Sequence, residues 1–123
     1  MIRLGVIGYG NRIHNVINHC LRDVEPDLRI VGIVDPDQAG VRARLAPRDE
    51  EAIRFYDSLD ELVRGAKIDA LAIGTRCNLH APYAIEAARY DLPLYLEKPV
   101  AISMAQATAL EEAFENARCP VVV

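Results

Sequence analysis

The chain has 123 residues, 51% of them hydrophobic and 26% charged, which is enough for one globular domain with its own core. Its net charge of −4 argues against a nucleic-acid or anionic-membrane partner, and no apolar run is long enough to span a bilayer. The three cysteines are odd in number and form no C-x-x-C motif, so we expect no disulfide framework and no metal site, as is typical of a cytoplasmic protein.

A short apolar run, residues 2–7, ends abruptly in a glycine turn and predicts the first strand. Gly8 allows the tight turn, and Gly10 lets a pyrophosphate approach the backbone at the start of the next helix. Helical spacing begins straight afterwards and predicts an amphipathic helix with one apolar face. That face consists of Ile13, Val16, Ile17, Cys20, Leu21 and Val24.

A second apolar strand, residues 28–34, ends at Asp35, where a dinucleotide site places the acidic residue that binds ribose hydroxyls. The third glycine of G-x-G-x-x-G is replaced by Ile13, at the point where the helix normally packs closest to the strand. A glycine turn after a strand also occurs for purely steric reasons, which is the structural alternative. The order of glycine turn, second strand and Asp35 favours a dinucleotide site.

The next segments continue the alternation of helix and strand. Residues 38–45 predict a helix, residues 47–51 a charged surface helix end or loop, and residues 53–56 a short third strand. Ser58 and Glu61 have the spacing of a capping box and begin another short helix.

The second half of the chain repeats this pattern. Residues 69–75 form a nearly continuous apolar strand, as expected where both faces of a sheet are covered, and a helix follows with Pro82 expected in its first turn. Residues 92–96 predict a fifth strand, and Ser103 and Gln106 form a capping box before a helix. Residues 119–123 begin a sixth strand and stop inside it, so we expect the chain to be part of a longer protein.

Strands alternating with helices predict an α/β fold, a doubly wound parallel sheet of the Rossmann type with strand order 3-2-1-4-5-6 over residues 1–123. Four motifs then occur in one order and at one spacing, and together they resemble the N-terminal NAD(P)-binding domain of the Gfo/Idh/MocA oxidoreductases. The motifs are Gly8-Tyr9-Gly10-Asn11-Arg12, Asp35-Pro36-Asp37, Thr75 followed by His80, and Glu97-Lys98-Pro99. The resemblance covers the whole chain. It implies that a C-terminal domain, which supplies the substrate site and the oligomer interface, is missing from this sequence.

The resemblance also implies the residues that bind the dinucleotide. They are Gly8, Tyr9, Gly10, Asn11, Arg12, Asp35, Thr75, Glu97 and Lys98. Arg12 either adds a charge to the phosphate grip or is simply solvated. A carboxylate at Asp35, with Asp37 beside it, repels a 2′-phosphate and favours NAD over NADP, unless a nearby arginine reverses that preference.

For the chemistry, the resemblance points to Lys98, Glu97 and His80 as catalytic residues. The Lys98 ammonium would polarise a carbonyl or help to move a hydroxyl proton, and Glu97 would orient it. His80 has a structural alternative, because a polar residue early in a helix often only satisfies backbone groups. Arg76 stands where the family has proline, and it either binds an anionic substrate group or lies solvated on its loop.

The function implied is that of an NAD(P)-dependent oxidoreductase acting on a sugar, polyol or related alcohol or ketone. The alternative is a nucleotide-binding or sensing module without turnover. The resemblance further implies a sugar-like small-molecule substrate and a homo-oligomer at full length, while the isolated 123 residues should be inactive because half of the active site is absent.

Overall fold

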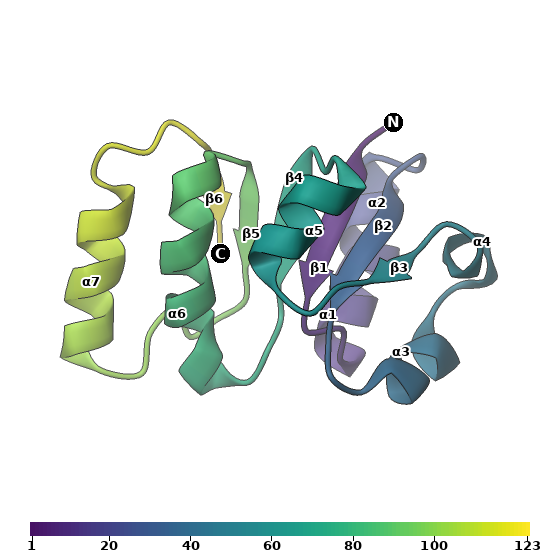
Figure 1. Ribbon diagram of the computed structural model, residues 1–123, viewed down its shortest axis with the longest axis horizontal. Helices are drawn as coiled ribbons and strands as arrows, with labels where there is room; N and C mark the ends of the chain where they lie inside the picture. Colours follow the sequence, from purple (N-terminus) through teal and green to yellow (C-terminus); the bar gives the residue numbers. More distant parts are fainter.

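Six parallel strands form one sheet in the order β3-β2-β1-β4-β5-β6, which confirms the predicted topology. The computed structural model describes all residues, 1–123 (Figure 1). The strands are β1 (Arg3–Ile7), β2 (Arg29–Val34), β3 (Arg54–Phe55), β4 (Ala70–Ile73), β5 (Leu94–Leu96) and β6 (Val121–Val122). After β3 the chain crosses back over the sheet and forms β4 on the other side of β1, so the strand order reverses beside β1.

Two apolar clusters lie on opposite faces of the sheet, because side chains of successive strand residues point to opposite sides. In β4 (Ala70–Ile73), for example, Leu71 and Ile73 belong to one cluster, whereas Ala72 belongs to the other. Helices α5 (Leu59–Ala66) and α6 (Cys77–Ala87) cover the first cluster, and they lie in front of the sheet in Figure 1. Helices α1 (Asn11–Val16) and α3 (Gln38–Arg44) cover the second.

Both predicted capping boxes are confirmed. The Ser58 Oγ accepts from the Glu61 N–H at 3.1 Å before α5, and the Ser103 Oγ accepts from the Gln106 N–H at 3.1 Å before α7 (Met104–Phe114). The reciprocal bonds run from the residue before each cap, with the Ile102 N–H donating to Gln106 Oε1 at 3.0 Å.

The prediction for the buried face of the first helix is wrong for Cys20 and Val24, whereas Leu21 packs, partly buried, against the second apolar cluster as predicted. The helix continues from α1 through a π-helical turn, η1 (Ile17–Leu21), into α2 (Arg22–Val24). A π turn adds one residue to the repeat, so the interior position after Ile17 is taken by Arg22. Cys20 is therefore exposed, and Val24 is 87% exposed.

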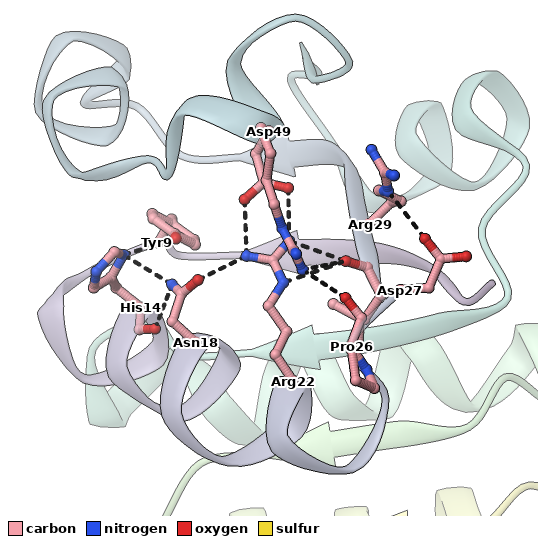
Figure 2. A network of polar contacts seen from close by, with 10 residues as sticks. Tyr9, His14, Asn18, Arg22, Pro26, Asp27, Arg29 and Asp49 are labelled. Carbon is pink, nitrogen blue, oxygen red and sulfur yellow. Dashed lines mark hydrogen bonds and ion pairs between the residues drawn. The ribbon is translucent and has the colours of Figure 1, made fainter.

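Arg22 is buried because it forms an ion pair with a fully buried carboxylate, Asp49. Asp49 belongs to α4 (Pro47–Glu50), so the segment predicted as a surface helix end or loop is a short helix anchored in the interior. The guanidinium bonds both oxygens of Asp49, at 2.7 and 3.0 Å, and also donates to the Leu28 carbonyl. Figure 2 shows Arg22 between Asp49 and Asn18, whose Oδ1 accepts at 2.7 Å.

Pro82 lies in the second turn of α6, not in the first turn as predicted. A proline there leaves the Asn78 carbonyl without its helical donor. The Gln106 side chain from the neighbouring helix α7 donates to that oxygen at 3.4 Å, which is how the proline is accommodated.

The sheet ends in an exposed edge at β6. Both strand residues are exposed, and helix α7 beside it has no buried residue. An apolar hollow of about 300 Å³ lies there, and its apolar lining includes Leu96, Val100, Leu110, Phe114, Val121 and Val123.

Candidate functional site

The carboxyl ends of β1, β2 and β4 meet around a cavity of about 430 Å³, at the point where the strand order reverses. In open α/β sheets this is the position at which ligands bind. The lining residues are Ile7, Gly8, Gly10, Val34, Asp35, Pro36, Asp37, Gly74, Thr75, Arg76, Leu79 and Tyr83. Four of the predicted cofactor residues, Gly8, Gly10, Asp35 and Thr75, are thus brought together.

Gly8 and Gly10 serve the turn in different ways. Gly8 has φ +78°, and a Cβ there would lie 2.7 Å from the Thr75 backbone, so only glycine fits. Gly10 is the N-cap of α1, and a Cβ built on it meets nothing within 4 Å. No side chain caps this helix. The backbone at Gly10 therefore faces open space, which matches the approach of a phosphate to a helix N-terminus.

The branched Ile13 at the third-glycine position is accommodated by a glycine on the strand side. Ile13 is buried, and a Cβ on Gly74 would lie 2.7 Å from the Ile13 Cβ. The helix and the strand thus pack closely with the larger side chain, Ile13, on the helix and the glycine, Gly74, on the strand side, which is the reverse of the usual arrangement. Gly74 directly precedes Thr75, so the signal was present in the sequence but was not used.

Tyr9 contributes its backbone to the turn and its side chain to the core. The ring is fully buried, and its hydroxyl lies 2.9 Å from His14 Nδ1 (Figure 2). Burial raises the pKa of the Tyr9 phenol and lowers the pKa of the His14 imidazole. The phenol is therefore the donor of this bond and neutral His14 the acceptor.

Asp35 is fixed by two backbone groups. Its Oδ2 accepts from the Tyr9 N–H at 2.9 Å and its Oδ1 from the Asp37 N–H at 2.8 Å. Each oxygen keeps a second lone pair, so the carboxylate is held ready to accept from hydroxyls of a ligand. Asp37 caps α3 through the Gly40 N–H at 3.1 Å.

An arginine does lie near these acidic residues. Arg44 Nε donates to the Tyr9 carbonyl at 3.1 Å, and Arg44 Nη2 is 4.0 Å from Asp37 Oδ2. The backbone of Tyr9 is therefore fixed at both of its polar groups, by Asp35 at the N–H and by Arg44 at the carbonyl. Sequence analysis did not single out Arg44, since its position in α3 carries no motif.

Arg12 is neither simply solvated nor a member of the cavity lining. Its Nε lies 3.3 Å from Glu97 Oε1, while its side chain is 67% exposed. Glu97 is largely buried, and its Oε2 accepts from the Tyr95 hydroxyl at 2.9 Å. Burial, followed by the hydrogen bond to Glu97, raises the pKa of Tyr95. The hydrogen bonds of Glu97 thus go to Arg12 and Tyr95, not to Lys98.

His80 joins the loops that follow β4 and β5. It is buried, with Nε2 2.8 Å from the Thr75 carbonyl and Nδ1 2.7 Å from the Pro99 carbonyl. Both ring nitrogens are thus occupied by backbone oxygens, as the structural alternative anticipated. Lys98, next to Pro99, is exposed and does not line the cavity. His80 holds the Lys98 loop beside Thr75.

Two cavity residues, Leu79 and Tyr83, were missed because they read as ordinary positions of α6. No group of three or more His, Cys, Asp or Glu residues is arranged to hold a metal ion. No helix is both long and apolar enough to cross a membrane.

Residues 2–123 match the profile of a protein family described as "Oxidoreductase family, NAD-binding Rossmann fold" (GFO_IDH_MocA). An inositol 2-dehydrogenase of Paracoccus denitrificans is 28% identical over 116 residues, which cover 94% of this chain and 34% of that protein. The chain thus spans about a third of the length of this relative.

Solved structures agree with this match. An oxidoreductase from Agrobacterium radiobacter, in complex with NAD+, L-tartaric acid and magnesium, is 28% identical with a TM-score of 0.79, and covers 99% of this chain and 34% of that chain. A myo-inositol dehydrogenase from Lactobacillus casei, in complex with NAD(H) and myo-inositol, has a TM-score of 0.83 at 22% identity, and covers 100% of this chain and 36% of that chain. At this lower identity, the myo-inositol dehydrogenase shows that the two chains share the fold.

Proposed function

This chain belongs to the Gfo/Idh/MocA family of oxidoreductases, and on that premise we propose that it is the NAD-binding domain of a dehydrogenase acting on a sugar, polyol or related alcohol or ketone. The observation that carries the proposal is the cavity at the strand reversal, which is lined by Gly8, Gly10 and an Asp35 fixed by backbone hydrogen bonds. The residues fit NAD, because glycine at position 10 leaves open the space through which a pyrophosphate would approach the backbone. A side chain there would occupy that space.

The dinucleotide is held by backbone and carboxylate. The N-terminus of α1 binds the pyrophosphate, and Asp35 accepts from the ribose hydroxyls of adenosine. Asp35 and Asp37 line one cavity and disfavour a 2′-phosphate, so NAD is preferred to NADP. Arg44 donates a hydrogen bond to the Tyr9 carbonyl, so it is less able to bind a 2′-phosphate and reverse the preference for NAD.

Bound NAD supplies the hydride chemistry, and Lys98 supplies the charge at the reacting carbon–oxygen bond. The Lys98 ammonium stabilises negative charge on the substrate oxygen or takes part in moving its proton. His80 acts as a positioning residue, because it ties the Pro99 carbonyl beside Lys98 to the Thr75 carbonyl in the cofactor cavity. Glu97 is a second positioning residue, since it links this loop to Arg12 at the start of α1.

A C-terminal domain completes the enzyme in this proposal, with the substrate site and the oligomer contacts. The length of the curated relative, of which this chain covers 34%, supports it. The three free cysteines support a reducing cytoplasm as its location.

The test is a full-length protein carrying Lys98→Met, with Lys67→Met as the matched control, because these are the chain's only two lysines. Lys98→Met should lower kcat by ~10²-fold or more and leave the Kd for NAD nearly unchanged, since the ammonium acts on the reacting oxygen and not on the adenosine half. Lys67→Met should change neither. Unimpaired turnover of Lys98→Met would contradict this role and favour a binding module.

A further inference from the structure

Arg76 lies across the cavity from Asp35, at the N-cap of α6. The residue is exposed, and its backbone carbonyl accepts from the Thr75 hydroxyl at 3.1 Å. Its guanidinium makes no hydrogen bond and no ion pair within the protein, in contrast to Arg12, Arg22 and Arg44, which all have partners. The cavity thus contains one cation that the fold itself does not use.

The walls around Arg76 identify the half of the dinucleotide that this cavity accepts. Val34 and Pro36 form an apolar side next to Asp35, and Leu79 and Tyr83 face them from α6. Glu97 and Lys98 are absent from the lining. A carboxylate that accepts from ribose hydroxyls, next to an apolar slot, describes an adenosine site with room for a flat base.

We propose that Arg76 stacks its guanidinium on the adenine ring of the bound dinucleotide. The inference deepens the proposed function and rests on it. A planar guanidinium stacks well on aromatic faces, and an uncharged base suits a slot that also holds two carboxylates. A 2′-phosphate would be a poorer partner, because Asp35 and Asp37 line the same cavity. Arg76 is thereby a binding residue of the adenine end, not a receptor for an anionic substrate group.

The experiment measures binding of four probes to the 123-residue chain: ADP-ribose, ribose 5-phosphate, NAD and NADP. Arg76→Ala should raise the Kd for ADP-ribose about 3- to 10-fold and leave ribose 5-phosphate, which has no base, unchanged. The ratio of NADP to NAD affinity should stay the same. Arg76→Lys should recover only part of the loss, because it keeps the charge without the planar face.

Arg54→Ala is the matched control, since Arg54 is an exposed arginine that lines a different hollow, and it should change none of these affinities. An unchanged Kd for ADP-ribose in Arg76→Ala would overturn the inference, as would an equal loss for ribose 5-phosphate or a larger loss for NADP. Those outcomes leave NAD binding by the wild type intact. Failure of the wild type to bind NAD at all would overturn the proposed function as well, so the two failures are distinguishable.

Discussion

Single residues decide the shape of the dinucleotide turn, and its two glycines have separable duties. Gly8 is required by backbone geometry, because its φ is positive and the Thr75 backbone leaves no room for a Cβ. Gly10 has room for a side chain in the free protein, so the fold does not require glycine there, and we propose that this glycine serves the dinucleotide.

Gly8→Ala should therefore destabilise the protein by about 1–3 kcal/mol, the usual cost of forcing a non-glycine residue into such a conformation. Gly10→Ser should keep its stability, because serine is a favoured N-cap, yet lose most NAD affinity through the side chain placed in the phosphate path. Urea unfolding and NAD titration of both variants check this. Full NAD affinity in Gly10→Ser would contradict the assignment.

Protonation of His14 should make the free energy of unfolding depend on pH. Burial lowers the pKa of His14 below its ordinary 6.5, and its Nδ1 accepts from buried Tyr9 only in the neutral form. The unfolded chain then binds the proton more readily than the folded chain, so this stability is present above pH 6.5 and lost as the pH falls below it. Unfolding free energies from pH 7.5 to 5 should decline less in His14→Gln than in the wild type. Parallel declines would exclude His14 as the cause.

Secondary-structure elements were predictable where a local rule fixed them. The capping boxes, the strand order and the glycine turn all follow from short patterns that tertiary contacts do not override. The π turn did not follow, because the apolar residues from Ile13 to Val24 fit an ordinary helical period equally well. Only the long-range partner Asp49 explains why Arg22 points inward, and no pattern within the helix reveals it.

The residues of the candidate site likewise fall into those whose position a local pattern predicts and those whose position it does not. Asp35 and Gly8 stand at strand ends, where the sheet must bring them together, so the sequence placed them correctly. The pairing of Ile13 with Gly74 joins positions that are 61 residues apart in sequence, and it depends on the register of two elements. Arg44, Leu79 and Tyr83 reach the turn or the cavity from helix faces that carry no motif.

The buried ion pair between Arg22 and Asp49 should contribute far more to the free energy of unfolding than an exposed ion pair does. Asp49→Ala leaves a buried guanidinium without its partner, and the free energy of unfolding should fall by about 3–5 kcal/mol. Asp27 forms an exposed pair with Arg29, so Asp27→Ala should have little effect. Thermal and urea unfolding of the two variants provide the comparison. Similar losses in both would show that burial does not set the strength of this pair.

The molecule as a whole is a sheet whose strands β1, β2 and β4 are covered on both faces and whose candidate site lies at the strand ends. The two apolar clusters fix β1, β2 and β4 from both sides, so the residues at their carboxyl ends hold their positions without a ligand. Preorganisation of this kind is what a dinucleotide site needs from its scaffold.

The open edge at β6 has a consequence for the chain in solution. Val121 and Val122 expose apolar side chains, and nothing in this structure pairs with the outer side of the strand. A hydrophobic strand with free backbone groups is a template for another strand, so the 123-residue chain should self-associate as its concentration rises. Val122→Lys should suppress this, because a charged side chain on an edge opposes pairing. Sedimentation velocity across a concentration series would reveal the difference, and concentration-independent monomers in the wild type would mean that this edge is not adhesive.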